Sequence, residues 1–176
     1  RSFFTITPSL SIGLPLLLCM STLSVTAAAK NLASEADVSG RGSMVQGAVD
    51  GVKQVAGKGE WIGGSPSEWY GLVEYPELTL KWDAAQTINQ VVLYDRPSLD
   101  EHMGACVLKF DDGSEVHAFA IPNDGSPHTL TFSPRKVGSM TLNVVDGVGS
   151  NIGLSEIEVY HRPDAKPSAA AKKQFT

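Results

Sequence analysis

The sequence predicts an antiparallel β-sandwich or barrel, and two observations carry this prediction. Seven short apolar runs follow one another after residue 76, and most of them alternate apolar with polar side chains, which is typical of half-buried strands. Turn-forming residues separate the runs at close intervals, and no segment after residue 30 has a sustained helical pattern. The chain of 176 residues is long enough for about one domain with a real core.

The N-terminal segment predicts a secretory signal peptide over residues 1–29. Arg1 precedes an apolar run at residues 10–20, and Ala27-Ala28-Ala29 offers the small residues of a cleavage site. A retained membrane anchor is the alternative, although the uninterrupted run is shorter than the roughly 20 residues that span a bilayer. Cleavage predicts a secreted, extracellular protein without a stable membrane span. It would leave Cys106 as the single cysteine, either a buried small hydrophobe or a reactive thiol.

The domain itself is predicted over residues 30–162. Its first part predicts an extended edge segment that ends in a turn at Asp50-Gly51, where glycine can adopt a positive φ. A loop rich in Gly and Ser follows, with Trp61 and Trp69 in it. The seven predicted strands then span Glu77–Trp82, Thr87–Tyr94, Met103–Phe110, Glu115–Ile121, His128–Phe132, Ser139–Val145 and Leu154–Tyr160.

The connections between these strands have the composition of turns. The segment FDDGSEV predicts a hairpin, because two alternating apolar runs flank an Asp-Gly pair. Further turns are predicted at residues 122–125, at Ser133-Pro134-Arg135 and at residues 146–149.

The segment INQVVLYDRP, residues 88–97, predicts a buried strand that carries charge at its end. Proline cannot donate a hydrogen bond to a strand ladder, so the strand should stop near Tyr94 and leave Asp95 and Arg96 in a loop. A loop at the end of a rigid strand is a common place for a binding site. A salt bridge of Arg96 with Glu60 or Asp95 is the structural alternative.

The body of the chain is acidic, with nine Lys and Arg against 18 Asp and Glu from Asn31 to Arg162, a net charge of −9. An acidic body without a basic stripe argues against nucleic acid as a partner. Residues 163–176 are rich in Pro, Ala, Ser and Lys and predict a disordered tail or linker.

Five segments occur in the order seen in a known family: NLAS, AVDG, INQVVLYDRP, LKFDDGSEV and GLSEIEVY. Together they resemble discoidin-like (coagulation factor 5/8 type C) domains and family 32 carbohydrate-binding modules, over about Asn31 to Arg162. The chain is also similar to the galactose-binding-like domains attached to PIG-L-type sugar deacetylases. The resemblance implies a jelly-roll β-sandwich of about eight strands, with ligand-binding loops at one end.

The same resemblance implies one structural calcium ion. Its side-chain ligands would be Asp50 and Glu156, with the carbonyls of Gly47, Val52, Val55 and Ser155 as further ligands. Two carboxylates and several carbonyl oxygens suit a hard cation. Val52 departs from the pattern, since many relatives have a polar or acidic side chain there. Without a metal, Asp50 could cap its own turn and Glu156 could be a solvated strand residue.

Recognition of a sugar needs an aromatic platform for its apolar face and polar groups for its hydroxyls. Residues of these types are Glu60, Trp61, Trp69, Asp95, Arg96 and Asn151. Trp61 could equally belong to the core, and Trp69 could pack beneath the sheet edge.

The sequence carries no metalloprotease, nucleophile-elbow or nucleotide-binding motif, so we expect no enzyme. We expect a secreted, non-catalytic module that binds cell-wall or extracellular glycan. The alternatives are a protein- or lipid-interaction module of discoidin type and an accessory domain of a sugar deacetylase.

Overall fold

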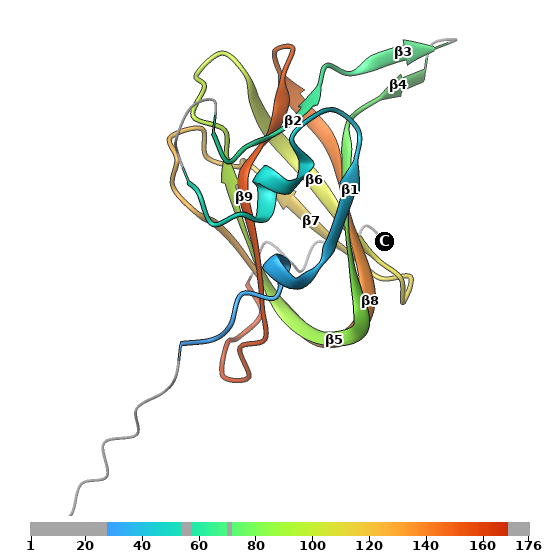
Figure 1. Cartoon of the computed structure of the whole chain (residues 1–176), viewed down its shortest axis with the longest axis vertical. Helices are drawn as coiled ribbons and strands as arrows, with labels where there is room; N and C mark the ends of the chain where they lie inside the picture. The colour runs from blue at the N-terminus through green and yellow to red at the C-terminus, as the bar shows by residue number, and fades with distance from the viewer. Residues whose placement is uncertain (1–27, 54–57, 70–71, 169–176) are drawn as a thin grey trace, which may run out of the picture.

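Two long bent strands organise the structure, a computed structural model that describes residues 28–53, 58–69 and 72–168. β5 (Glu77–Asp95) and β8 (His128–Val148) pair antiparallel from Glu77 opposite Asn143 to Leu93 opposite His128. Both strands bend midway, as Figure 1 shows, so that each contributes to two layers. The predicted signal peptide, apart from its last two residues, lies outside the described residues.

The other strands add to this pair in the order β2-β9-β5-β8-β6-β7, with β1 also on β5. Their bounds are β1 (Asp37–Gly40), β2 (Trp61–Gly64), β6 (His102–Phe110), β7 (Glu115–Phe119) and β9 (Ile152–Tyr160). Because β5 bends, its first half pairs with β1 and its second half with β9. The second half of β8 pairs with β6, which in turn pairs with β7. The predicted antiparallel β-sandwich is therefore confirmed.

Three smaller features complete the fold. Two short 3₁₀ helices, η1 (Ala33–Glu35) and η2 (Val45–Val49), flank β1. A hairpin of β3 (Ser67–Trp69) and β4 (Leu72–Glu74) projects from the sandwich in Figure 1. Among the described residues, no helix has the length and apolar content needed to cross a membrane.

The prediction of four separate strands in residues 77–94 and 128–145 is wrong, because each pair is one continuous strand. The ladder between β5 and β8 shifts register between Lys81 and Gln86, and again between Ile88 and Gln90, which are irregularities that let a strand bend without ending. The predicted turn at Ser133-Pro134-Arg135 falls within the second irregularity. Pro134 is tolerated there because it has no ladder hydrogen bond to donate.

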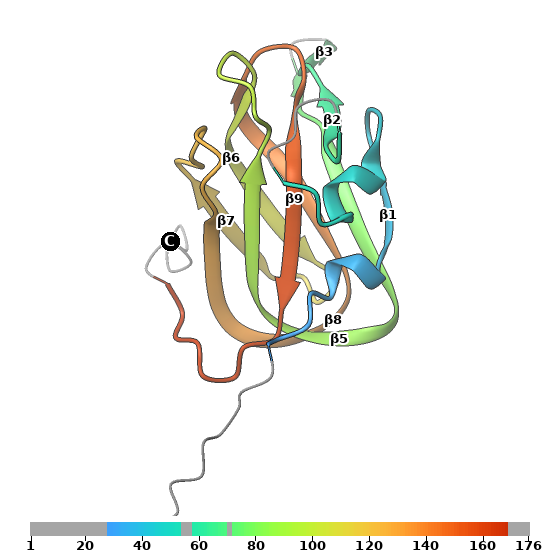
Figure 2. The ribbon, with the colours of Figure 1, turned by 60° about the vertical axis from the view of Figure 1, so that its left-hand side comes forward.

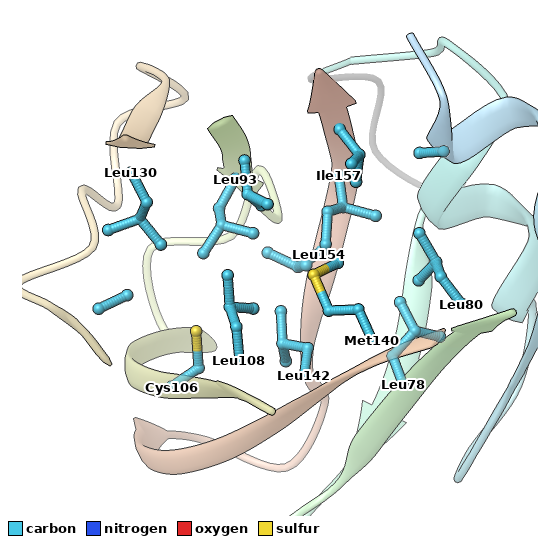
Figure 3. Close-up of a cluster of buried hydrophobic side chains, with 14 of the residues drawn as sticks. Leu78, Leu80, Leu93, Cys106, Leu108, Leu130, Met140, Leu142, Leu154 and Ile157 are labelled. Atoms are coloured by element: carbon cyan, nitrogen blue, oxygen red, sulfur yellow. The ribbon is translucent and has the colours of Figure 1, made fainter. Parts of the chain in front are cut away.

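The core lies between the two layers and is drawn in Figure 3. Leu78 and Leu80 of β5, Leu108 of β6, and Met140 and Leu142 of β8 are all completely buried. Cys106 is buried among them, and burial raises the pKa of its thiol. Cys106 is therefore a small core residue rather than a reactive thiol.

The FDDGSEV hairpin forms as predicted. Gly113 has a φ of 80° and donates to Phe110 O, while Ser114 N donates to the Asp112 carboxylate at 2.9 Å. Gly51 also has a positive φ, 81°, in the predicted Asp50-Gly51 turn.

Part of the predicted disordered tail lies against the sandwich. Ser168 N donates to Thr131 O at 2.8 Å, and the Ser168 hydroxyl also lies within hydrogen-bond distance of that oxygen. This contact uses a backbone carbonyl of β8 in a stretch that pairs with β5 but not with β6. Residues 169–176 lie outside the described residues.

Candidate functional site

Four strands begin or end at one end of the sandwich, and this brings three distant loops together. β5 ends at Asp95, β6 begins at His102, and β9 and β2 begin at Ile152 and Trp61. Asp95 pairs with Leu154, and Trp61 also pairs with Leu154, so these strand ends are neighbours. Figure 2 shows the resulting loops at the end opposite the bends of β5 and β8.

One arginine ties these loops together. Arg96 Nε donates to Glu60 Oε2 at 2.7 Å, and Nη1 donates to Glu101 Oε2 at 3.1 Å and to the carbonyl of Asn151. The Asn151 amide in turn donates to Glu101 Oε1 at 2.6 Å. We refer to Arg96, Glu60, Glu101 and Asn151 as the Arg96 cluster.

The centre of the Arg96 cluster is buried. The side chain of Arg96 is 10% exposed and that of Glu60 is 3% exposed, whereas Glu101 retains 23%. A glycine is required beside it, because a Cβ on Gly153 would lie 1.9 Å from Trp61 O and 3.2 Å from Arg96 Cδ. The structural alternative for Arg96, a salt bridge to Glu60, is therefore present, and it includes a second acid, Glu101.

Part of the cluster, its rim, reaches the surface, since Glu101 retains 23% of its side-chain exposure. Asn151 is half-buried, and within the described residues no hydrogen bond engages Arg96 Nη2. The sequence pattern does not single out Glu101. Its position five residues after Arg96, in the same short loop, is the signal that could have found it.

Asp95 lies inside the sandwich rather than in the loop. It is completely buried and accepts a hydrogen bond from Met103 N at 3.2 Å. Burial raises the pKa of Asp95 to about 7, and hydrogen bonds from the backbone of Met103 and Arg96 and the charge of Arg96 act in the opposite direction. Asp95 therefore fixes the start of β6 from the interior.

Trp61 belongs to the core. Its side chain has no exposed surface, and Nε1 donates to Arg41 O at 2.8 Å. A ring without exposed surface cannot stack on a sugar. Burial thus places Trp61, Glu60 and Asp95 in the interior of the sandwich. Trp69 is the last residue of β3, and its side chain lies outside what the structure describes.

The two carboxylates predicted to hold calcium meet beside η2. Glu156 is completely buried, its Oε2 accepts a hydrogen bond from Gly51 N at 3.0 Å, and its Oε1 has no hydrogen-bond partner in the described part of the chain. Burial raises the pKa of Glu156 to about 7; the Gly51 hydrogen bond opposes this, and the charges of Glu158 and Asp50 reinforce it. A buried carboxylate oxygen without a donor fits a cation.

Other expected ligands of that cation are only partly in place. Asp50 is exposed and its Oδ1 caps its own turn by accepting from Val52 N at 2.8 Å. Residues 28–53, 58–69 and 72–168 contain no group of three or more His, Cys, Asp or Glu side chains arranged for a metal, so carbonyl oxygens would have to complete the shell. Val55, whose carbonyl was one of those expected, lies outside the described residues.

Comparison with known proteins gives one family and a set of solved structures. A family described as "Domain of unknown function (DUF7402)" matches residues 24–160. No curated protein matches the chain.

The solved structures similar to this chain include carbohydrate-binding modules and a lectin. The CBM32-5 module of a Clostridium perfringens GH89 protein, in complex with GalNAc-β-1,3-galactose, has a TM-score of 0.58 at 17% identity, over 75% of this chain and 100% of that chain. Chitosan-binding module 1 of a chitosanase/glucanase from Paenibacillus sp. IK-5 has a TM-score of 0.56 at 19% identity, over 75% and 99%. A fucolectin from striped bass (Morone saxatilis) serum has a TM-score of 0.60 at 15% identity, over 76% and 49%. At these identities the likeness shows a shared discoidin-like, galactose-binding-like fold.

Proposed function

The chain belongs to the DUF7402 family, and we propose that it is a secreted, non-catalytic module that binds glycan through the loops around the Arg96 cluster. The shared fold of carbohydrate-binding modules and a lectin supports glycan as the class of ligand. The target we propose is a cell-wall or extracellular polysaccharide. The signal-like composition of residues 1–29 supports secretion.

The Arg96 cluster is the observation that carries this proposal. Its ion pairs hold the loops at residues 58–60, 96–101 and 149–151 in one arrangement before any ligand arrives, which lowers the entropic cost of binding. The rim then offers an amide from Asn151, a carboxylate from Glu101 and the Nη2 donor of Arg96. Planar polar groups of these three kinds suit the paired hydroxyls of a sugar ring.

A substitution of Asn151 tests the rim directly. Asn151→Ala removes the amide while leaving the carbonyl that Arg96 uses, so we expect about tenfold weaker glycan binding with little loss of stability. Binding would be measured by calorimetric titration with the glycan selected from an array.

Gln86→Ala is the matched control, because it removes an amide from the bend of β5, at the other end of the sandwich. Equal glycan affinities of the wild type and Asn151→Ala would show that the rim of the cluster does not contact the glycan. Folded protein that binds no glycan on the array would contradict the function itself.

We also propose that a hard cation such as calcium binds at Glu156, with Asp50 as a second charged ligand. The support is the buried Glu156 Oε1 without a donor. The cation would neutralise the two carboxylates and join η2 to β9, so we expect it to stabilise the fold without touching the glycan.

Calcium added in large excess should raise the melting temperature of the wild-type protein, because a ligand at about 100 times its Kd stabilises the native state by about 2.7 kcal/mol. Glu156→Gln should abolish this rise. Glu115→Gln, which removes an exposed carboxylate on β7, should keep it. An equal rise in wild type and Glu156→Gln would show that calcium binds elsewhere.

A further inference from the structure

A groove lies beside the projecting hairpin and shares no residue with the Arg96 cluster. It has a volume of about 670 Å³ and is open to solvent. One wall is formed by the end of β4 at Val73, the link at Tyr75 and the start of β5 at Glu77, and the other is β8 at residues 143–145. The volume is in the range of small-ligand sites.

Hydrogen bonds fix both walls of this groove. Arg41 Nη1 donates to Ser67 Oγ at 3.1 Å and to Glu74 O at 3.2 Å, and Nη2 donates to Ser65 O at 3.1 Å. Val144 N donates to Pro76 O at 3.1 Å, which holds the two walls together at the base. The groove is therefore preformed rather than created by a ligand.

Two carboxylates, those of Glu74 and Glu77, are among the polar residues that line the groove. Glu77 is exposed and uses Oε2 to accept from the Asn143 amide at 3.0 Å. The Glu74 side chain is exposed and makes no hydrogen bond or ion pair with any described residue. The Arg41 guanidinium, the one cation in the lining, is directed to the hairpin's own oxygens. The groove thus offers negative charge to a ligand.

Apolar surface lies next to these carboxylates. Val73 is 56% exposed and Val145 is 43% exposed, and Tyr75 is half-buried against the core. Both valines line the groove. A ligand that suits this surface has an apolar face and a positively charged group, and a protonated amino sugar has both.

We propose that this groove is a second glycan subsite that takes an amino-sugar unit with a free, protonated amine. The proposal rests on the proposed glycan-binding function. The amine donates to Glu74 and Glu77, and the apolar face of the ring packs on Val73 and Val145. The net charge of −9 over residues 31–162 favours the approach of such a cationic polymer.

The test is a calorimetric titration of the whole chain with a glucosamine oligomer and with its fully N-acetylated counterpart, at a mildly acidic pH. We expect the free-amine oligomer to bind about tenfold more tightly. The double variant Glu74→Gln, Glu77→Gln should lose about tenfold in affinity for the free-amine oligomer and nothing for the acetylated one.

A charge-matched control separates the groove from general attraction between an acidic protein and a cation. Asp83→Asn with Asp124→Asn also removes two exposed carboxylates and should leave both affinities unchanged. Equal loss in the control and the groove variant would overturn the subsite, as would equal binding of the two oligomers. If folded protein binds neither oligomer nor any glycan on the array, the proposed function fails together with the subsite. If the protein binds the acetylated oligomer but not the free-amine oligomer, the amino-sugar subsite is ruled out and the proposed glycan-binding function stands.

Discussion

Arg96→Ala should destabilise the domain by about 3–5 kcal/mol and lower Tm by on the order of 10 °C. The substitution leaves Glu60, with a side chain 3% exposed, as a buried charge that has lost its guanidinium partner. It also releases Glu101 and the Asn151 carbonyl, so three loops lose their common donor. Chemical denaturation of the purified variant measures this loss.

Two comparisons make that result specific. Lys136→Ala removes an exposed cation on β8 and should change stability by no more than about 0.5 kcal/mol. Arg96→Met combined with Glu60→Gln removes both members of the buried ion pair and should recover much of the loss, because no unpaired charge remains between them. An Arg96→Ala protein as stable as wild type would mean that the cluster does not hold the loops.

Stability should fall as the pH rises from about 5 to about 8, and Asp95 should cause a large part of the change. The folded-state pKa of Asp95 is about 7, raised above its ordinary value of 3.8 by burial. The folded protein therefore holds a proton that the unfolded chain releases, and this stabilisation is full at low pH and is lost as the pH approaches 7. At about 1.4 kcal/mol per unit of pKa shift, the effect is on the order of 2–4 kcal/mol.

Asp95→Asn should flatten this pH profile, because an amide keeps an oxygen for Met103 N and does not titrate. Asp124→Asn is the control. A serine hydrogen bond lowers the pKa of exposed Asp124, so its contribution to stability changes only at acidic pH. The account of Asp95 would be contradicted by a wild-type profile that rises between pH 5 and 8, or by an unchanged slope in Asp95→Asn.

The sequence predicted the strands better than their continuity. Apolar runs located β6, β7 and β9 to within two residues at each end, because the apolar side chains of these strands pack in the core. A bend within a strand and a turn between two strands contain the same types of residue, however. Ser133-Pro134-Arg135 therefore has the composition of a turn although β8 runs through it. The continued pairing with β5 on both sides of the register shift is what distinguishes a bent strand from a turn here.

The sequence predicted which residue types form the candidate site better than it predicted the directions of their side chains. Arg96, Glu60 and Asn151 do meet at one end of the sandwich. Trp61 is an aromatic residue in a loop rich in Gly, so its type and position suggest a platform for a sugar ring. Pairing of β2 with β9 instead directs the ring inward. Which acid pairs with Arg96 depends on how three loops close in space, and local sequence does not encode that closure.

The groove beside the hairpin had no sequence signal. Arg41, Glu74 and Asn143 are far apart in the chain and are ordinary surface residues when they are considered singly. They meet because β1 and β8 both pair with the first half of β5.

A titration followed by amide NMR spectra tests the central claim most directly, since it shows both whether a glycan binds and where. The wild-type domain would be titrated with the best ligand from a glycan array. We expect shifts concentrated in residues 96–101 and 149–151, with Asn151 and Glu101 among the largest. Spectra that do not change, or shifts concentrated on the bends of β5 and β8 at the opposite end, would contradict the account.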